Sequence, residues 1–425
     1  MPLEVSKIKK NLKKVISEGR DIEDVLNMTA NENVTSKTAK YFLSTNFSDR
    51  YFAGEYYENT LEDKKCCYLV GLVMRNFPGV CQLEKKARFA MKKMFKANYC
   101  DFKPLSGLNA VFCILSAVSD PGDNIYILTP QSVGHHATVP LLNSINRKIS
   151  FIPWDSKNFT VDLDKFKKEV KKNKPDLIFL DYGTPLYPLP VKEIRSIVGR
   201  RTLIIYDASH VLGLIAGGFF QDPIGEGCDI LIGNTHKTFP GPQKAVLMYK
   251  NKKLGEEIYN KLFEYAISSQ HLHQAISLFV SVIEMYHHGK NYADQLIKNS
   301  HALSEALEGE GFSLIQKDNQ YSQSHIIAVS GPFPDDHNKA CIRLHKCGIS
   351  TNSRKMFGIQ ALRIGVQEAT RKGMKEKEMV KIASFFKKIV LEKVCDQFMR
   401  SKVKRFNRRF KKTEYTMDDE FNIVK

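Results

Sequence analysis

One loop of this chain reads Gly233-Asn234-Thr235-His236-Lys237-Thr238-Phe239-Pro240-Gly241-Pro242-Gln243 and follows a short apolar run at residues 230–232. Its lysine, Lys237, stands beside Thr235, His236 and Thr238, and a Gly-Pro turn follows. A lysine alone in a loop is usually solvated, but neighbouring hydroxyl groups and a tight turn favour a pocket for a phosphate and an imine. A lysine that forms an imine must be partly desolvated to stay nucleophilic near neutral pH. The loop therefore predicts a reactive lysine just beyond a strand.

A second segment, Asp207-Ala208-Ser209-His210, ends another apolar run, at residues 202–206. Ligands of open parallel sheets bind beyond the carboxyl ends of the strands, so a carboxylate here can point into a crevice. Taken alone, Asp207 reads more readily as a helix N-cap. Taken with Lys237, it predicts a pyridoxal phosphate (PLP) site. Lys237 would hold the cofactor aldehyde as a Schiff base, and Asp207 would keep the pyridine nitrogen protonated.

Other residues could complete this site. Ser106 and Gly107 precede an apolar helical pattern, and a helix N-terminus with a hydroxyl group suits the PLP phosphate, although an ordinary capped helix fits the same residues. His135 follows another strand and could stack on the pyridine ring, or it could be a surface-loop histidine. Arg363 lies between apolar neighbours and needs an anion, either a substrate carboxylate or a structural acidic partner.

Short, β-branched apolar runs alternate with helical patterns along the middle of the chain. This pattern is typical of a mostly parallel sheet with helices on both faces. A smaller C-terminal α/β unit follows, with strands expected at 325–330 and near 362–364 and a long helix from about residue 375. The expected strands of the large unit are 124–128, 148–152, 177–180, 202–206, 230–232 and 245–249, with helices at 162–172 and 190–198.

We therefore expect four parts: an N-terminal arm (1–30), a large PLP-binding domain (31–284), a small C-terminal domain (285–400) and a basic tail (401–425). The 425 residues are enough for two domains, and 43% hydrophobic with 26% charged residues is ordinary for a globular protein. No apolar run reaches the ~18 residues that span a bilayer, and no signal peptide is evident.

The net charge of +18 lies partly in the tail. Such a tail can bind nucleic acid or an acidic surface, but it is more often a solvated helix end, and no nucleic-acid-binding motif supports the first interpretation. The nine cysteines are an odd number without a C-x-x-C pair, so we expect reduced thiols, a cytoplasmic location and no metal site.

Several motifs, in order, resemble those of serine hydroxymethyltransferase, a PLP enzyme of fold type I. The Asp207–His210 segment and the Thr235-His236-Lys237-Thr238 run are the most specific. The weaker matches are Thr29-Ala30-Asn31-Glu32-Asn33-Val34-Thr35-Ser36, the Ser106-Gly107 turn, Arg363-Ile364-Gly365 and Thr370-Arg371-Lys372-Gly373. The likeness spans most of the chain.

The resemblance implies roles beyond those already given. His210 would bind the ring hydroxyl, and Thr184, Thr235 and His236 would also belong to the cofactor site. Asn31 would lie near the substrate carboxylate that Arg363 binds. Tyr51 matches an active-site tyrosine that the family supplies across a dimer interface. The stretch of Ser268, Ser269 and Gln270 would reach the phosphate of a neighbouring subunit, so a homodimer is expected.

The departures from the family concern the substrate more than the cofactor. The family's Y-A-E-G motif reads Tyr51-Phe52-Ala53-Gly54 here, so Ala53 replaces the glutamate that serves the substrate hydroxyl and the folate. Glu55 lies two residues further on, and a shift of that size in a loop is not equivalent. Residues 132–136 also lack the family's folate motif. PLP contacts are retained, whereas contacts to tetrahydrofolate are eroded.

These observations lead to an aldol-type PLP enzyme that cleaves or forms the Cα–Cβ bond of a β-hydroxy amino acid, as an aldolase or a transaldolase with L-threonine as a plausible donor. One alternative is a folate-dependent glycine hydroxymethyltransferase in which Glu55 or Glu32 replaces the missing acid. Others are an aminotransferase or decarboxylase on the same scaffold, because fold alone does not set the reaction, and a silent or nucleic-acid-binding protein.

Overall fold

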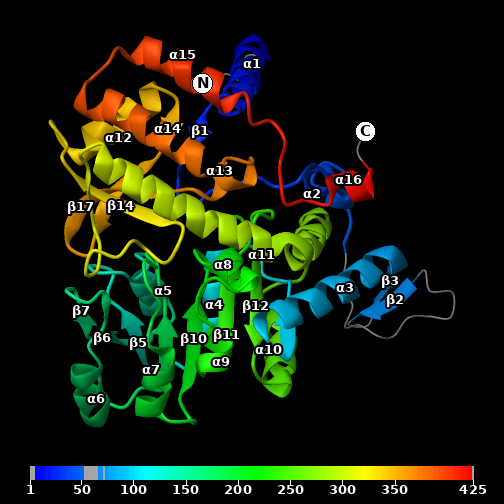
Figure 1. Ribbon diagram of the computed structural model, residues 1–425. Coiled ribbons are helices and arrows are strands. Elements are labelled where there is room, and N and C mark those ends of the chain that lie inside the picture. The colour runs from blue at the N-terminus through cyan, green and yellow to red at the C-terminus, as the bar shows by residue number, and fades with distance from the viewer. Residues whose placement is uncertain (1–4, 52–65, 70–71, 424–425) are drawn as a thin grey trace.

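The computed structural model describes residues 5–51, 66–69 and 72–423, and its centre is a seven-stranded sheet (Figure 1). The strand order is β4-β12-β11-β10-β9-β5-β6. Strands β11, β10, β9, β5 and β6 run parallel, whereas β12 is antiparallel to both neighbours. The bounds are β4 (Tyr99–Asp101), β5 (Asn124–Leu128), β6 (Lys148–Ile152), β9 (Leu177–Leu180), β10 (Leu203–Asp207), β11 (Ile230–Asn234) and β12 (Ala245–Tyr249).

Helices bury this sheet on both faces, because its central strands are apolar at consecutive positions. Ile205 belongs to the core formed with α4 (Gly107–Val118) and α10 (Lys252–Tyr265), whereas its neighbour Tyr206 belongs to the core on the other face. Consecutive side chains of a strand point to opposite faces, so both faces need apolar residues. The predicted α/β class with a mostly parallel sheet is confirmed.

The second face of the sheet is covered by elements that include α3 (Pro78–Phe95) and α8 (Leu212–Gly217). The other elements of this part are α2 (Lys37–Phe42), a 3-10 turn (Asn46–Asp49), β2 (Cys66–Leu69), β3 (Leu72–Arg75), α5 (Thr138–Ser144), β7 (Trp154–Asp155), β8 (Thr160–Val161), α6 (Leu163–Lys172), α7 (Val191–Val198) and α9 (Pro223–Glu226).

The C-terminal part holds a four-stranded antiparallel sheet in the order β13-β14-β17-β16. Helix α11 (Leu272–Gly309) crosses between this part and the large sheet, and it passes through residues 284 and 285 without a break (Figure 1). The bounds are β13 (Ser313–Leu314), β14 (Ile326–Gly331), α12 (His337–Lys346), β15 (Ile349–Ser350), β16 (Asn352–Met356), β17 (Ile359–Gly365), α13 (Gln367–Arg371), α14 (Glu376–Phe386), α15 (Asp396–Asn407) and α16 (Asp418–Phe421).

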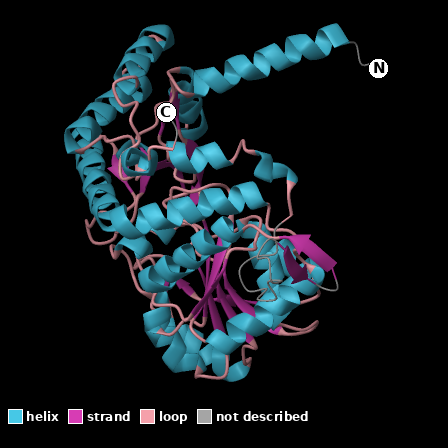
Figure 2. Ribbon diagram, turned by 90° about the vertical axis from the view of Figure 1, so that its right-hand side faces the viewer, coloured by secondary structure: helices cyan, strands magenta, loops and turns pink. Residues whose placement is uncertain are grey.

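The N-terminal arm begins as the helix α1 (Val5–Ile22), which projects from the body and buries none of its residues (Figure 2). The chain then joins the C-terminal part, because β1 (Leu26–Asn27) pairs in parallel with β15 and Thr29 forms a bridge to Ile364. Residues from the two ends of the sequence therefore lie side by side next to the small sheet.

The C-terminal region differs from the expected single long helix. Helix α14 passes into a wider turn at Lys387–Leu391, and Lys393 adopts a left-handed backbone (φ 50°) before α15 begins. The basic tail then packs on the body, since Val403 and Phe406 are buried and Arg408 pairs with Asp24 at 2.6 Å. Among the described residues, no helix has the length and apolar character needed to cross a bilayer.

Candidate active site

The carboxyl ends of β5, β9, β10 and β11 meet at a cavity of about 250 Å³, which contains the reactive groups predicted from the sequence. In the described part of the chain, Asp207 is the only acidic residue of its lining. The lining residues are Ser106, Gly107, Leu108, Val111, His135, Thr138, Tyr182, Gly183, Asp207, Ser209, His210, Asn234, His236 and Lys237.

Lys237 is the most buried amine of this cavity, with 9% of its surface exposed. Burial lowers its pKa to about 8, and the nearby Asp207 carboxylate partly opposes this decrease. Its Nζ lies 3.2 Å from Nε2 of His210, and its backbone carbonyl accepts a hydrogen bond from the Asn33 side chain at 2.6 Å. The loop is therefore fixed around an amine of which about a tenth is neutral at pH 7, far more than for a solvated lysine.

Asp207 ends β10, and its carboxylate accepts a hydrogen bond from the backbone N–H of Ser209 at 2.9 Å. His210 is buried on the same loop, and its pKa lies well below the usual range because of burial and the adjacent Lys237 charge. Its ring stacks on His325 with centroids 6.2 Å apart. The strand end thus presents one anion and one neutral imidazole.

Helix α4 begins at the opposite end of the cavity. Ser106 is its N-cap and accepts a hydrogen bond from the backbone N–H of Asn109 at 3.3 Å. A Cβ on Gly107 would lie 2.3 Å from side-chain atoms of Asn234, so only glycine allows this close approach. The helix start leaves backbone N–H groups facing a site for an anion, as predicted for a phosphate.

His135 lines the cavity on the loop after β5. The buried carboxyl of Asp181 accepts hydrogen bonds from the backbone N–H groups of His135 (3.1 Å) and Leu128 (3.0 Å), which fixes this loop to β5. Burial lowers the pKa of His135 to about 4, so its ring is neutral at physiological pH. This placement excludes the alternative of a solvated surface histidine.

Arg363 lies on β17 and is 7% exposed. Its guanidinium donates to the side-chain oxygens of Asn352 (2.9 Å) and Asn31 (3.1 Å), and burial lowers its pKa to about 10. Within the described residues, no carboxylate pairs with it, so the structural salt bridge considered from the sequence is absent there. A buried guanidinium held only by amides is suited to bind a carboxylate ligand.

Two predicted residues are buried close to the cavity without being part of its lining. The Thr235 hydroxyl donates to the carbonyl of Pro242 at 2.7 Å and accepts from the backbone N–H of Lys244 at 3.2 Å, so it holds the loop closed. Thr184 follows the lining residue Gly183, and its buried hydroxyl has no hydrogen-bond partner among the described residues.

The residues expected to act across a dimer interface lie together elsewhere. Tyr51, which is 65% exposed, lines a surface hollow of about 470 Å³ with Ser268 and Ser269. Leu105 also lines this hollow, and the next residue, Ser106, lines the catalytic cavity. Ala53 and Glu55 lie outside the described residues.

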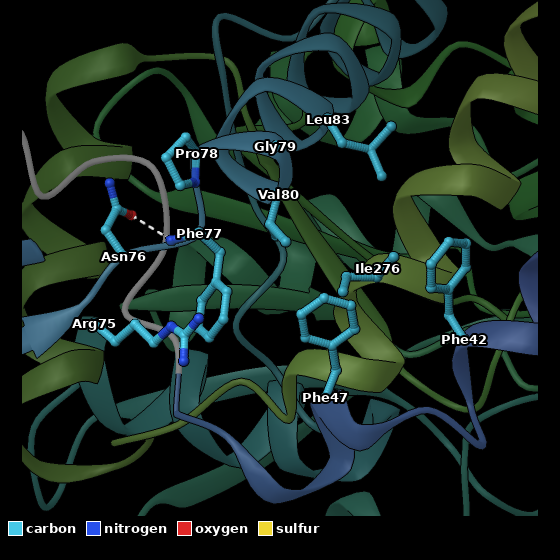
Figure 3. Close-up of a pocket in the computed structure, with 10 residues that line it drawn as sticks. All are labelled: Phe42, Phe47, Arg75, Asn76, Phe77, Pro78, Gly79, Val80, Leu83 and Ile276. Atoms are coloured by element: carbon cyan, nitrogen blue, oxygen red, sulfur yellow. Dashed lines mark hydrogen bonds between the residues drawn. The ribbon is translucent and has the colours of Figure 1, made fainter. Parts of the chain in front are cut away.

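A larger hollow, of about 780 Å³, lies apart from Lys237 and is mainly apolar (Figure 3). Figure 3 shows three aromatic rings, of Phe42, Phe47 and Phe77, in its wall, with Arg75 as its one charged side chain among the described lining residues. It has none of the groups that PLP chemistry requires, so the smaller cavity is the candidate active site.

Sequence reasoning missed several lining residues, among them Tyr182, Ser209 and Asn234. Asn234 is the last residue of β11, and Tyr182 closely follows β9. The rule that selected Asp207, namely a polar residue at the carboxyl end of a parallel strand, would also have selected these two residues. Another missed residue, Arg354 of β16, has no comparable signal, because its strand is antiparallel.

The residues present fit PLP. Buried polar atoms without a hydrogen-bond partner in the described part of the chain gather around the cavity, namely Nδ1 of His210, Nδ1 of His236 and Oδ1 of Asn234. Such atoms are costly unless a ligand or water satisfies them. Among the described residues, no group of three His, Cys, Asp or Glu side chains could bind a metal ion.

Comparison with known proteins agrees with this geometry. A family model described as serine hydroxymethyltransferase matches residues 5–386. The serine hydroxymethyltransferase of Pyrococcus abyssi is 35% identical over 414 residues, which cover 92% of this chain and 93% of the relative. The chain belongs to the serine hydroxymethyltransferase family. It is therefore a PLP-dependent enzyme of the transferase class with the fold-type-I architecture.

Two similar proteins carry other activities in their names. The fluorothreonine transaldolase of Streptantibioticus cattleyicolor is 33% identical, over 93% of this chain and 62% of that protein. The crystal structure of L-threonine transaldolase from Pseudomonas fluorescens matches with a TM-score of 0.87 and 26% identity, covering 98% of this chain and 95% of that one. Proteins named as serine hydroxymethyltransferases and proteins named as transaldolases are therefore both similar to this chain.

Proposed function

We propose that this member of the serine hydroxymethyltransferase family is a transaldolase that takes a β-hydroxy amino acid, with L-threonine as donor. The proposal rests on a contrast between the residues for the cofactor and amino acid, which are present, and the acid for folate, which is missing from its motif. The groups for PLP and an amino-acid carboxylate are assembled around Lys237, Asp207 and Arg363. Ala53 stands where the family places the acid that serves folate and the substrate hydroxyl.

Different residues of the site would bind the cofactor and the substrate. When bound, PLP supplies a ring system that takes up the electron pair left by a broken Cα–Cβ bond. Asp207 balances a positive charge on the ring nitrogen, and Ser106 with Gly107 receives the phosphate. Arg363 would bind the amino-acid carboxylate and thereby fix the orientation of the substrate in the site.

The nitrogen groups of Lys237, His135 and His236 are available for proton transfer and hydrogen bonding in the cavity. The pKa of Lys237 is lowered to about 8, closer to neutral pH than the pKa values of about 4 for His135 and His236. Lys237 is therefore suited to carry a proton during the reaction. His135 and His236 stay neutral, and a neutral imidazole can accept a hydrogen bond from the β-hydroxyl of the substrate.

A homodimer in the cytoplasm forms part of this proposal. Tyr51, Ser268 and Ser269 gather beside the phosphate end of the cavity rather than within it. Phe42 and Phe47, which line the apolar hollow of Figure 3, precede Tyr51 by only a few residues in the sequence. A second copy that covers this surface would bring these residues to its neighbour's site. Sedimentation equilibrium tests the dimer, and a monomer with full activity would contradict it.

The reaction is tested by supplying L-threonine with an aldehyde acceptor and measuring acetaldehyde release and the new β-hydroxy amino acid by mass spectrometry. We expect both products in equal amounts without tetrahydrofolate. Acetaldehyde without the new amino acid would indicate an aldolase instead. The absence of both products would contradict the proposal.

The second candidate is folate-dependent glycine hydroxymethyltransferase, which is favoured by the high identity to serine hydroxymethyltransferases. It requires a base in place of the acid missing at Ala53. The matched assay supplies L-serine with tetrahydrofolate and measures methylenetetrahydrofolate. A rate on serine and folate above the rate on threonine and aldehyde would favour this candidate.

A further inference from the structure

A second guanidinium lies beside Arg363 on the small sheet. In the antiparallel pairing of β16 and β17, Asn352 is opposite Arg363 and Arg354 is opposite Ala361. Side chains two positions apart on a strand share one face. Arg354 therefore projects from the same face as Asn352 and Arg363, and the charges of both arginines lower the pKa of Lys237.

The hairpin that carries Arg354 is fixed against the loop of His135. The backbone N–H of Phe357 donates to the carbonyl of Ser132 at 3.4 Å, and the Phe357 ring packs edge-on against Phe159 at 4.7 Å. The charge of Arg354 also lowers the pKa of His135. Arg354 is therefore held at the small-domain side of the catalytic cavity, not free in solvent.

Arg354 lacks an anion. Its side chain is partly buried, and among the described residues it has neither a hydrogen bond nor an ion pair. Burial lowers its pKa, and Arg363, which shares this face of the sheet, is a second cation whose own pKa the charge of Arg354 lowers. A guanidinium has five donors, and leaving them unsatisfied in a partly desolvated site is costly. This position therefore suits a negatively charged ligand.

The participants of the proposed reaction, on which this inference rests, indicate which ligand could bring an anion to Arg354. The donor carboxylate goes to Arg363, and the cofactor phosphate goes to Ser106 and Gly107. Threonine and acetaldehyde bring no further negative charge. The remaining participant is the aldehyde that replaces acetaldehyde.

We propose that Arg354 binds an anionic group, a carboxylate or a phosphate, on the acceptor aldehyde. The Cα–Cβ bond of threonine breaks, and its hydroxyl proton is released as acetaldehyde forms. A new bond then joins Cα to the carbonyl carbon of the acceptor, whose oxygen takes up one proton and becomes the β-hydroxyl. No oxidant or reductant is needed.

The test compares acceptors that differ in charge, in the PLP-loaded enzyme with L-threonine. Succinic semialdehyde is paired with butanal, and glycolaldehyde phosphate with glycolaldehyde. In Arg354→Gln, we expect kcat/KM for the preferred anionic acceptor to fall roughly 10- to 100-fold relative to its neutral partner, as for loss of a charge-assisted hydrogen bond. The pair with the larger decrease shows whether the anion is a carboxylate or a phosphate.

Two variants control for charge and folding. Lys355→Gln removes a positive charge from the adjacent, exposed position on the opposite face, and we expect it to leave the ratio unchanged. Arg354→Lys should retain part of the preference because it keeps the charge but not the planar fork. The inference would be overturned if Arg354→Gln kept the preference for the anionic acceptor. It would also be overturned if KM for threonine rose by as much as KM for that acceptor.

A binding measurement separates this inference from the proposed reaction. Calorimetry on the PLP-loaded enzyme should detect the unreactive anion 4-hydroxybutyrate or inorganic phosphate, but not 1-butanol, and Arg354→Gln should weaken that binding at least tenfold. If the enzyme transfers to no acceptor, the proposed function fails and calorimetry alone decides the role of Arg354. Equal binding to the wild type and to Arg354→Gln would refute it.

Discussion

The guanidinium of Arg363 donates to the side chain of Asn31 at 3.1 Å, across a separation of 332 residues in sequence. This contact brings the N-terminal segment and the small sheet together at the place where a substrate carboxylate is expected. Asn352 makes hydrogen bonds to both residues and so closes the group.

Replacement of Arg363 by alanine should weaken amino-acid binding and spare the cofactor. Loss of a charge-assisted pair costs about 1.5–3 kcal/mol, which corresponds to a roughly 10- to 100-fold weaker affinity for L-threonine. Spectrophotometric titration of the PLP-loaded variant with threonine measures this affinity. Arg363→Lys, which keeps the charge, should lose less, and unaltered threonine affinity in Arg363→Ala would count against the carboxylate role.

Replacement of Lys237 by alanine should abolish the visible absorbance of covalently bound PLP after dialysis, because Lys237 is the buried amine of the cavity. The matched control is Lys244→Ala, since Lys244 is also a buried lysine but lies outside the cavity lining. A dialysed Lys237→Ala protein with the spectrum of the wild type would contradict the assignment.

The pKa of about 8 at Lys237 predicts how PLP uptake depends on pH. Only the neutral amine attacks an aldehyde, and its fraction rises about tenfold between pH 7 and pH 9 for a pKa near 8. The rate constant for PLP uptake by the apoprotein should therefore increase with a midpoint near pH 8. Stopped-flow absorbance measures it, and a midpoint above pH 10 would mean that the amine is solvated.

The buried His325 predicts a loss of stability in acid. Burial lowers its pKa from 6.5 to about 3, so the unfolded chain takes up a proton that the folded chain rejects. The contribution is complete above the unfolded pKa of about 6.5 and is lost as the pH falls from there toward 3, by about 2 kcal/mol at pH 5. Urea unfolding at pH 7 and pH 5 measures this loss.

The variant His325→Gln should show a smaller decrease in unfolding free energy between these two pH values than the wild type. Replacement of the exposed His301 by glutamine is the control and should leave the difference unchanged. An identical decrease in all three proteins would show that His325 does not contribute.

The ion pair between Arg371 and Glu284 should be important for stability, because both side chains are at most 1% exposed and the pair joins α13 to α11 at 3.2 Å. Arg371→Met leaves a buried carboxylate without its cation, which costs about 3–5 kcal/mol. Urea unfolding measures it. The exposed pair of Lys298 and Asp294 is the control, and Lys298→Met should cost less than about 1 kcal/mol. Equal effects would contradict the argument.

Much of the central sheet follows from the sequence. The predicted strands at 124–128, 148–152, 177–180 and 245–249 match β5, β6, β9 and β12 residue for residue. Of these, β5, β9 and β12 are buried on both faces, and all four are bounded by charged residues or proline, so their ends are encoded locally. The break after α14 was not predictable, because Ile389 and Val390 continue the apolar pattern and are buried.

The candidate site, like the fold, could be predicted from the sequence only in part. Asp207, Lys237, His135 and Ser106 gather as expected because parallel strands place their carboxyl ends at one edge. The predicted cofactor role of Thr235 does not account for the hydrogen bonds of its hydroxyl within its own loop, a local detail that the motif does not reveal. Arg354 was not predicted, because its position depends on the contact of its hairpin with the loop of His135, which the sequence does not reveal.

The pairing of β1 with β15 has a consequence for the order of synthesis on the ribosome. The N-terminal residues leave the exit tunnel first, yet their partner strand emerges more than 300 residues later. A nascent chain that ends before Ile349 carries Lys237 but neither β15 nor Asn352 and Arg363, the hydrogen-bond partners of Asn31. The group of Asn31, Asn352 and Arg363 can therefore form only after synthesis has passed Arg363, more than 300 residues after Asn31.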